Sequence, residues 1–588
     1  MKKHYAIVLP FLPLLAFLGL YAVIFAFLQA HSKFHFYFVE QNQLFQNAWP
    51  YISGHLVRPG GMAIVVSEFL VQFFILPCAG AGITAALLTA SAILAHCIVR
   101  RIRPEVSLSG LCLLPAITLM MIHFDFNYLA SGTVAFLTAE AAFCLVLGIK
   151  DGKWRLAAHL AVIPALFFLA GGVFVLYAAL ALIAPAPKDR RGLAMRAVPA
   201  VEALLTGILG IYFALYGEYR HVFLPDGYYH SSLEPPGVIY FSWCSLLLVF
   251  ILACLLGNRK ARNRIWTPLQ LILVLAAALY GIKEYDDRKS YMMKELDYYS
   301  RTGQWDNILE RCRGKLNNYL YMAYANLALT EKGELGDRMF AYDQRGAHGL
   351  LVDWNRTASV SILLSDVYFA VNATALSQEM AFEACISATG DGNPRMVKRL
   401  VQTNLINGAY AVAEKYISVL ENTIGYRSWA SGQRRFLYDD DAIERDMLLG
   451  DKRSSLASDA SLSMIDGIEA ELMCIARANP SNRAAVTYAG AIYLLGKDMD
   501  GFRGFVDRYF ATPVLPSLPV IFQEAVIILS ESDPDYRRRF DISEAVASRF
   551  GHYKRQVVEA NRSGSANALP SLMVRAYGDT YWYYFMFK

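Results

Sequence analysis

Long apolar segments fill the first 283 residues of the chain, and they constrain its fold more than any other feature. A membrane-spanning helix needs about 20 mostly apolar residues. We therefore expect an all-α protein that begins with a polytopic membrane domain of about nine spans. The expected spans are residues 5–29, 79–99, 107–123, 128–148, 156–170, 172–187, 195–216, 238–256 and 265–283. The fifth and sixth are short and meet at Gly171-Gly172, so they could also form one long or broken helix.

Basic residues are distributed unevenly between the expected loops. The outer loops before Ile282 contain only Lys33, Arg58 and Arg220, whereas every expected cytoplasmic segment contains at least two Lys or Arg residues. The positive-inside rule then places the N-terminus in the cytoplasm. With nine spans, everything after Lys283 lies on the periplasmic side. We thus expect a multi-pass protein of the inner, cytoplasmic membrane, in contact with the lipid bilayer.

Residues 61–77 are apolar enough to cross the membrane, but the charge pattern argues against a crossing. A span here would move Arg100 to Arg103 and every later basic loop to the outer side. Glu68 and Gln72 are spaced i, i+4, so one face of a helix would be polar. We expect an interfacial or re-entrant helix, and a long first outer loop over residues 31–78.

The second half of the chain has the pattern of a water-exposed helical protein. Four stretches share one plan: an apolar helix, a turn with Gly or polar residues, an aromatic residue or Leu, and a second apolar helix. They are residues 299–312, 327–342, 404–420 and 491–506. The plan resembles tetratricopeptide repeats (TPRs) in degenerate form. It predicts an irregular TPR-like α-solenoid over residues 285–588, after a transmembrane domain over residues 1–284.

Solenoid surfaces mostly bind proteins or peptides. An envelope protein or a peptide is therefore a candidate partner, and the alternative is a helical cap that covers the membrane domain. No block of Lys and Arg resembles a nucleic-acid arm, and no C-x-x-C pair exists among the nine cysteines. The acidic triplet at 439–441 fits a helix N-cap better than a metal site.

The first outer loop holds more polar chemistry than a connector needs. Residues 36–61 read FYFVEQNQLFQNAWPYISGHLVRPGG. Further carboxylates fall in outer segments, and with the loop they suggest an outer-face cavity roofed by the C-terminal domain. These carboxylates are Glu68, Asp125, Asp226 and Glu234.

A cytoplasmic N-terminus, one span, a long acidic outer loop and many later spans resemble GT-C glycosyltransferases. In that family an Asp or Glu of the first outer loop works with a polyprenyl-phosphate sugar donor. The resemblance implies Glu40 as a catalytic residue and Asp125 as a second acid. The family often has paired acids, and here Gln41 follows Glu40 instead. The resemblance extends to an all-α, GT-C-like membrane domain.

The chemistry of sugar transfer indicates further candidates in the same region. The reaction needs a base for the acceptor hydroxyl and a cation near the phosphate, which leaves room for a divalent cation although no metal-ligand set is recognisable. Arg58 and the backbone N–H groups of Gly60 and Gly61 could bind the phosphate, and His55 could assist. The other candidate substrate-binding residues are Gln41 and Glu68. Alternatively, the Arg-Pro-Gly-Gly sequence only turns the chain.

A second resemblance is closer. The pattern YFVEQNQLF…RPGG…EFLVQFF…P is similar to the N-terminal signature of an uncharacterised family of Bacteroidota membrane proteins with a tetratricopeptide-like C-terminal half. This resemblance covers most of the chain and implies architecture, not activity.

Three functions remain open from the sequence. The first is a GT-C-type glycosyltransferase that uses a polyprenyl-phosphate-linked sugar on the outer face. The second is a non-catalytic, membrane-anchored scaffold for envelope protein assembly. A transporter with Glu140 as its ion site ranks last, because the spans show no internal repeat.

Overall fold

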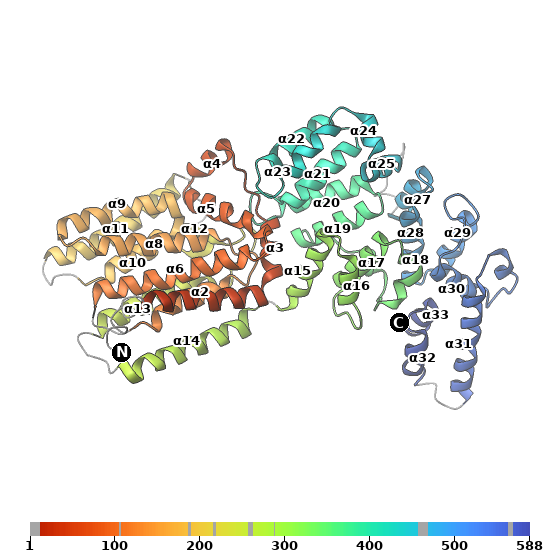
Figure 1. Cartoon of the computed structure of the whole chain (residues 1–588), viewed down its shortest axis with the longest axis horizontal. Coiled ribbons are helices and arrows are strands. Elements are labelled where there is room, and N and C mark those ends of the chain that lie inside the picture. Colours follow the sequence, from red (N-terminus) through yellow and green to blue (C-terminus); the bar gives the residue numbers. More distant parts are fainter. Residues whose placement is uncertain are drawn as a thin grey trace, which may run out of the picture. The chain divides into compact units, whose positions relative to one another are not determined.

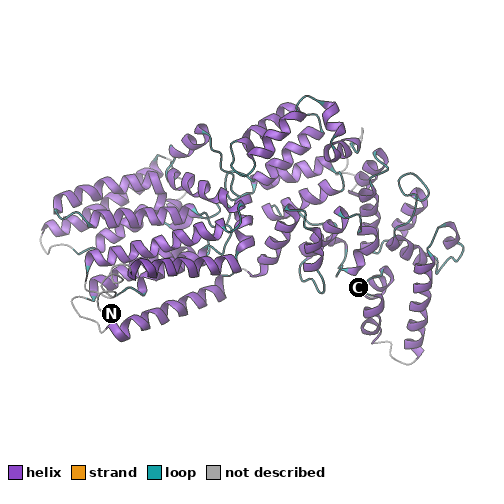
Figure 2. Cartoon of the chain, in the orientation of Figure 1, coloured by secondary structure: helices purple, strands orange, loops and turns teal. Residues whose placement is uncertain are grey.

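The protein is all-α, as predicted (Figures 1 and 2). A computed structural model describes residues 12–104, 108–185, 190–213, 215, 219–256, 263–286, 288–456, 468–562 and 568–588. The β-type pairings among these residues are two isolated bridges, Tyr128–Tyr229 and Phe510–Leu515.

The chain divides into two compact units, and the division does not follow the sequence in one cut. The first unit contains Met1–Tyr291 together with two later segments, Ala388–Pro394 and Val419–Ser428. The second unit contains Met292–Ser387, Arg395–Ser418 and Trp429–Lys588. The predicted boundary at residue 284 did not anticipate the two later segments of the first unit.

Apolar helices build the first unit and bury one continuous hydrophobic core. The α-helices are α2 (Leu12–His31), α3 (Lys33–Gln41), α4 (Trp49–Leu56), α5 (Gly61–Val71), α6 (Ala79–Ile102), α7 (Leu114–Ile122), α8 (Ser131–Leu147), α9 (Gly152–Ala170), α10 (Phe174–Ile183), α11 (Arg190–Tyr212), α12 (Tyr219–Phe223), α13 (Phe241–Leu255) and α14 (Asn263–Tyr285). Five short 3-10 helices lie between them: η2 (Gln72–Ile75), η3 (Leu111–Leu113), η4 (Gly171–Val173), η5 (Pro225–Tyr228) and η6 (Gly237–Tyr240).

Six segments among the described residues are long and apolar enough to cross a membrane. They are Leu14–His31, Ala79–Ile102, Gly152–Ile183, Gly192–Tyr212, Gly237–Leu255 and Trp266–Tyr285. The expected spans at 107–123 and 128–148 form shorter apolar helices, Leu111–Ile122 and Ser131–Leu147, and the segment at 61–77 forms Gly61–Ile75. The protein is thus a membrane protein by its helices, with six candidate spans by length and composition, and the count of nine stays a prediction.

The longest of these segments reverses direction at its glycine pair. The Nδ1 atom of His159 in α9 lies 2.9 Å from the hydroxyl oxygen of Tyr177 in α10. In a straight helix, residues 18 apart would be separated by about 27 Å. Gly171 has a φ of 78°, in the left-handed region that glycine adopts without strain. Helices α9 and α10 therefore form an antiparallel hairpin, so a single straight helix is excluded.

Three contacts define the two ends of this helix bundle. Arg101 at the end of α6 donates to the carbonyl of Cys144 in α8 at 2.6 Å, and we call this side the basic end. The rings of Phe17 and His96 meet near it, so α2 and α6 run antiparallel. At the opposite end His31 pairs with Asp286 at 2.8 Å. Helices α2 and α14 are therefore parallel and both leave the bundle at the opposite end.

The second unit consists of shorter helices, preceded by α15 (Arg288–Arg301), which crosses the boundary between the units. Its α-helices are α16 (Trp305–Arg311), α17 (Tyr319–Glu331), α18 (Leu335–Arg338), α19 (Ala358–Ala370), α20 (Thr374–Ile386), α21 (Pro394–Ile406), α22 (Tyr410–Glu421), α23 (Arg427–Gln433), α24 (Asp440–Arg445), α25 (Met447–Ser454), α27 (Ile468–Ala478), α28 (Arg483–Gly496), α29 (Met499–Tyr509), α30 (Val520–Leu529), α31 (Glu544–Arg562), α32 (Leu569–Tyr577) and α33 (Tyr581–Phe587). Four 3-10 helices accompany them: η7 (Met339–Ala341), η8 (Ala347–Gly349), η9 (Arg434–Phe436) and η10 (Tyr536–Arg539).

The four stretches that share a sequence plan all form helix–turn–helix pairs. Gly303, Gly333 and Gly408 have left-handed φ angles of 68°, 69° and 71° between their helices. In the fourth stretch Lys497 takes this conformation, with a φ of 55°. The predicted turns are therefore confirmed. The predicted N-cap is also present, because Asp439 accepts a hydrogen bond from the amide of Ala442 in α24.

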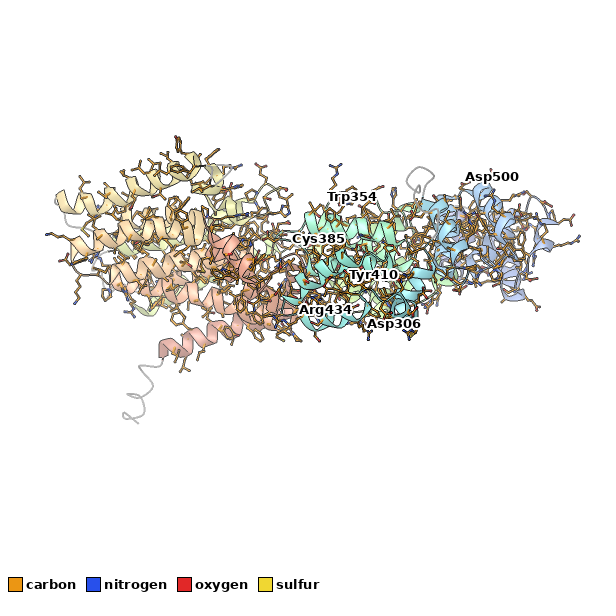
Figure 3. The ribbon with its side chains drawn as sticks, turned by 90° about the horizontal axis from the view of Figure 1, so that it is seen from above. Asp306, Trp354, Cys385, Tyr410, Arg434 and Asp500 are labelled. Carbon is orange, nitrogen blue, oxygen red and sulfur yellow. The ribbon has the colours of Figure 1, made fainter. Side chains whose placement is uncertain are left out.

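Buried charges tie several helices of the second unit together. Arg395 of α21 donates to Asp297 of α15 at 2.7 Å and to Asp366 of α19. Arg399 also reaches Asp366, at 2.9 Å. Buried charges of this kind persist only where they are paired, so this network fixes how α15, α19 and α21 pack. Exposed polar side chains such as Asp306 and Arg434 project from the surface of the unit (Figure 3).

Candidate functional site

The region of the expected first outer loop is folded, and two segments from the second half of the chain complete it. The amide of Gly390 donates to the carbonyl of Asn42 at 2.9 Å. The amide of Ile424 donates to the side chain of Gln72 at 3.3 Å. These contacts lie within the first unit. The expected long loop is thus three helices, α3 to α5, packed against chain segments that lie far away in the sequence.

Four polar side chains from this region form one connected group. Tyr51 and His55 are spaced i, i+4 on α4, and their ring centroids lie 4.6 Å apart. The Tyr51 hydroxyl donates to Oε2 of Glu68 on α5 at 2.6 Å. His55 Nε2 lies 2.8 Å from Oδ2 of Asp391. We call Tyr51, His55, Glu68 and Asp391 the four-residue group.

The glycine pair before α5 brings this group together. Gly60 has a φ of 78°, and its amide lies 2.9 Å from the carbonyl oxygen of Phe168 in α9. A Cβ atom on Gly61 would lie 1.9 Å from the carbonyl oxygen of His55. A side chain at Gly61 would therefore push α4 and α5 apart. The Arg58-Gly61 segment acts as the tight turn that holds Tyr51 against Glu68.

Burial and hydrogen bonding shift the proton affinities of all four residues. Desolvation raises the pKa of Glu68 to about 7, against a smaller lowering by the Tyr51 hydrogen bond. Desolvation, with the charge of Glu68, raises the pKa of Tyr51. The hydrogen bond between His55 and Asp391 raises the pKa of His55 and lowers that of Asp391. The group therefore contains one carboxyl that titrates close to neutral pH, Glu68, beside the pair of His55 and Asp391.

The Tyr51 hydroxyl has an acceptor for each protonation state of Glu68. When Glu68 is ionised, Tyr51 donates to it. When Glu68 is protonated, the carboxyl can donate to the Tyr51 oxygen, because the Tyr51 hydroxyl can turn to the carbonyl of Leu44 at 2.9 Å. A carboxyl with a pKa near the working pH is suited to general acid–base catalysis. The geometry thus lets Glu68 take up and release a proton while every polar atom of this contact stays bonded.

Exposure differs across the group and gives it an inner and an outer side. The side chain of Asp391 is 53% exposed and that of His55 is 12% exposed, whereas Glu68 is 5% exposed. Arg58 is exposed and acts electrostatically on both His55 and Asp391. A ligand would therefore meet Arg58, Asp391 and His55 first, with Tyr51 and Glu68 behind them.

Several predicted site residues lie elsewhere. Glu40 and Gln41, at the end of α3, are 3% and 0% exposed. Asp125 accepts hydrogen bonds from Tyr229 at 2.6 Å and from the amide of Asn127 at 2.9 Å. The amides of Gly60 and Gly61 are donated to backbone carbonyls, that of Gly61 to Arg58 at 3.1 Å. The structure brings His55 and Glu68 together but does not expose Glu40 or free these two amides.

The other expected outer carboxylates form a separate pair. Arg220 contacts Oδ2 of Asp226 at 3.2 Å and Oε1 of Glu234 at 3.7 Å. Tyr240 also donates to Asp226. The described residues contain no group of three or more His, Cys, Asp and Glu side chains that could hold a metal ion.

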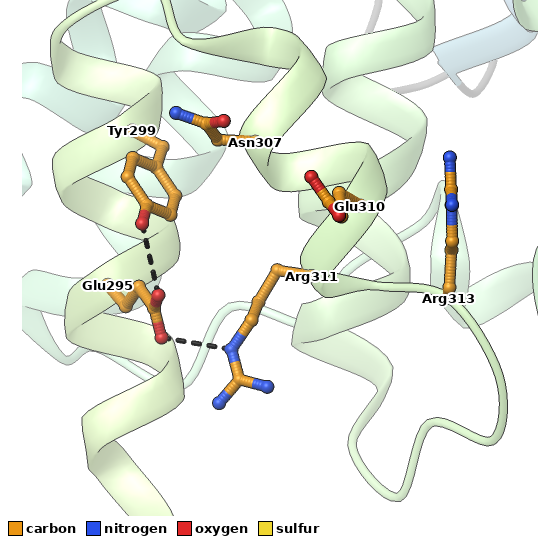
Figure 4. A pocket seen from close by; sticks show the side chains of 6 residues that line it. All are labelled: Glu295, Tyr299, Asn307, Glu310, Arg311 and Arg313. Carbon is orange, nitrogen blue, oxygen red and sulfur yellow. Dashed lines mark hydrogen bonds and ion pairs between the residues drawn. The ribbon is translucent and has the colours of Figure 1, made fainter.

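A polar hollow lies within the second unit and has a volume of about 400 Å³. Figure 4 shows six residues that line it: Glu295, Tyr299, Asn307, Glu310, Arg311 and Arg313. Glu295 is held on two sides there, by Arg311 at 2.9 Å and by Tyr299 at 3.1 Å. The hollow could hold a small ligand or a side chain that carries both donors and acceptors.

One protein-family model matches residues 3–588, and its description is "Family of unknown function (DUF6057)". The chain belongs to this family. The match covers the helix bundle, the four-residue group and the second unit of this chain. This confirms the predicted membership of an uncharacterised family. No curated protein and no solved structure is significantly similar to this DUF6057 chain.

Tyr51 and Asp391 were not among the predicted site residues. Tyr51 had a signal in the sequence, because it precedes His55 by four residues and could share a helical face with it. Asp391 lies in the Gly390-Asp391-Gly392 sequence of the other half of the chain, and no local pattern links it to His55.

Proposed function

We propose that this protein is an integral membrane transferase of the GT-C type, which moves a sugar from a polyprenyl phosphate to an acceptor hydroxyl at the outer face of the membrane. The observation that supports it most is the hydrogen bond between Tyr51 and Glu68 beside the His55–Asp391 pair. This places a carboxyl with a pKa of about 7 behind an exposed arginine, next to an apolar helix bundle.

The proposed topology has nine passes, with the basic end in the cytoplasm. The antiparallel hairpin of α9 and α10 counts as two passes. Helices α6 and α8 end together at Arg101 and Cys144, so α7 must return the chain between them. Since α2 and α14 end together at the opposite end, α3 to α5 and the start of the second unit would both face the periplasm. Cysteine labelling of Asp391→Cys and Lys153→Cys in intact cells tests this in a chain whose native cysteines, among them the exposed Cys78 and Cys244, are replaced by Ser. Label is then expected only at position 391.

Each member of the group has a proposed role. Glu68 is the base that removes the proton from the acceptor hydroxyl as its oxygen attacks the anomeric carbon of the donor sugar. The bond between that carbon and the phosphate oxygen breaks, and its electron pair leaves on the polyprenyl phosphate. Arg58 and protonated His55 balance the negative charge of this leaving group, and Asp391 holds His55 in its protonated form. Tyr51 positions the Glu68 carboxylate.

This assignment moves the base from Glu40 to Glu68. Glu40 and Glu68 are both buried, at 3% and 5% exposed. Glu68, however, accepts a hydrogen bond from Tyr51, whose ring packs against the predicted site residue His55. The predicted roles of Glu40 and Asp125 remain untested predictions. A divalent cation near the phosphate also remains a prediction.

Transfer of labelled sugar from a polyprenyl phosphate in membranes that contain the full-length chain tests the proposal. We expect Glu68→Gln to lower kcat by about 100-fold or more, as loss of a general base does. Tyr51→Phe should lower kcat less and raise the pH at which activity reaches half its maximum. Glu234→Gln is the matched control, because this carboxylate is 87% exposed and outside the group.

Two results would contradict the proposal in different ways. Full activity of Glu68→Gln together with loss of activity in Glu40→Gln would return the base to Glu40. An absence of transfer by the wild-type chain with every polyprenyl-phosphate sugar tried would remove the transferase class. Gel filtration of each detergent-solubilised variant separates these results from misfolding.

The second candidate is a membrane-anchored scaffold whose TPR-like second unit binds an envelope protein or peptide. Its supporting observation is the polar hollow beside Glu295 and Arg311, on the first helix–turn–helix pair. Site-specific photo-crosslinking from Asn307 tests it. A single partner that is lost in Arg311→Gln, with no effect of Glu68→Gln, would favour the scaffold over the transferase.

A further inference from the structure

A groove opens into the helix bundle at its basic end, away from the four-residue group. It has a volume of about 550 Å³ and is walled by α2, α6 and α14, with the segment before α7 closing it. Its walls are mainly apolar and include Phe17, Leu20, Val23 and Leu271. Volumes of this size are typical of sites for small ligands.

The polar residues of the groove are concentrated at one end. Helices α2 and α14 begin at the basic end and α6 finishes there, so Arg100 and Thr267 lie at the mouth. Val23 and Leu271 lie deeper. From Phe17 to Val23 the apolar wall continues for about 9 Å along α2. The groove is therefore amphipathic along its length, with a cationic mouth and an apolar interior.

The Arg100 guanidinium retains capacity for a ligand. Its Nη1 donates to the carbonyl of Pro104 at 2.7 Å, and it has no carboxylate partner among the residues that the structure describes. Arg100 is exposed, and His96 lies one helical turn deeper in the same wall. An arginine in this setting suits the planar, bidentate recognition of a phosphate group.

The surroundings of the groove point to the bilayer as the source of its ligand. Only 11% of the apolar window of α2 and 17% of that of α14 are buried inside the protein, so these helices expose hydrocarbon side chains beside the opening. A molecule with an acyl chain could enter sideways between them. Basic pockets between transmembrane helices on the positively charged side are typical sites for anionic lipid head groups.

We propose that this groove is a binding site for an anionic glycerophospholipid of the cytoplasmic leaflet. One acyl chain lies along Leu20, Val23 and Leu271, and the phosphate sits at Arg100. This site is independent of the proposed transfer reaction, which is placed at the opposite end of the bundle.

Native mass spectrometry of the delipidated full-length chain tests the proposal, with palmitoyl-oleoyl phosphatidylglycerol and the matching phosphatidylcholine as probes. We expect wild type to retain one phosphatidylglycerol more tightly than phosphatidylcholine. Arg100→Gln should weaken phosphatidylglycerol about fivefold, the equivalent of roughly 1 kcal/mol for one basic residue at an anionic surface. Arg100→Lys should keep most of the preference.

A second variant fills the groove and does not depend on charge. No atom lies within 4 Å of a Cβ built on Gly19, which lines the groove. We therefore expect Gly19→Trp to be accepted by the backbone and to weaken both lipids by filling the groove. Lys153→Gln is the control, because it removes a positive charge at the same end but outside the groove. Equal binding of the two lipids by wild type, or unchanged phosphatidylglycerol binding by both Arg100→Gln and Gly19→Trp, would overturn the assignment.

Discussion

His55 and Asp391 lie 2.8 Å apart, although they come from opposite halves of the chain. The contact joins α4 to a short glycine-flanked segment that belongs to the first unit. Because the imidazole gains a carboxylate partner, its pKa rises, and the carboxylate pKa falls. The pair connects a segment of the second half of the chain to the candidate site, and its strength depends on pH.

The His55–Asp391 pair should stabilise the fold in mild acid, where His55 is protonated and Asp391 is ionised, and should lose this effect as the pH rises. The pKa of His55 is raised, so its contribution is complete below its ordinary value of 6.5 and disappears as the pH rises through the folded value. A double-mutant cycle with His55→Gln and Asp391→Asn should give a coupling of roughly 0.2–1 kcal/mol at pH 6, because Asp391 is half exposed. Equal coupling at pH 6 and pH 10 in thermal unfolding would contradict this.

Glu68 should make the protein less stable as the pH rises toward neutrality. Between its ordinary value of 4.5 and about 7, the folded state binds more protons than the unfolded state, so stability falls with rising pH. Glu68→Gln stays neutral and should abolish this slope. At pH 8 it should be more stable than wild type by about 1–3 kcal/mol. The check is the melting temperature of the detergent-solubilised protein from pH 5 to pH 8. The same dependence of melting temperature on pH in wild type and Glu68→Gln would contradict the burial of this charge.

Gly61→Ala should destabilise the first unit, because the new methyl group would meet the carbonyl oxygen of His55 at 1.9 Å. We expect a loss of about 1–3 kcal/mol, as for other overpacked sites, and a weaker Tyr51–Glu68 contact. Gly54→Ala on α4 is the matched control. No atom lies near its Cβ position, so alanine there should raise helix stability by up to about 1 kcal/mol. Melting temperatures that shift in the same direction for Gly61→Ala and Gly54→Ala would contradict the close packing at Gly61.

Lys452 in α25 should make the second unit more stable in mild alkali. Its amine donates to the carbonyl of Phe369 at 2.5 Å and to Asn372 at 2.8 Å, and burial lowers its pKa to about 8. Between pH 8 and its ordinary value near 10.5 the unfolded state binds the extra proton, so stability rises with pH on the order of 1 kcal/mol per unit. Lys452→Met should remove this rise, while the exposed Lys415→Met should retain it in chemical unfolding experiments.

Local patterns predicted those features whose cause is local. Gly303, Gly333 and Gly408 mark turns because only glycine takes a left-handed conformation at little cost. Asp439 caps a helix because its carboxylate reaches the free amides of the first turn. The i, i+4 spacing of Glu68 and Gln72 predicted a polar face on an apolar helix, and both side chains make polar contacts there.

Features that depend on tertiary contacts could not be predicted in the same way. Hydropathy marked 107–123 and 128–148 as spans, and the apolar helices observed there, Leu111–Ile122 and Ser131–Leu147, have fewer residues than the usual 20. The reversal at Gly171 was one of two alternatives until the contact between His159 and Tyr177 decided it. Asp391 joins the site only because its segment folds back onto α4, and a single sequence carries no signal for that contact.

The division of the first unit has a consequence for the order in which the protein matures. During synthesis the helix bundle leaves the ribosome first, but Ala388–Pro394 and Val419–Ser428 follow only after much of the second unit has been made. The bundle can therefore enter the membrane before His55 has its partner. The candidate site is assembled late. A chain that stops at Tyr291 would insert as helices but would lack the His55–Asp391 pair.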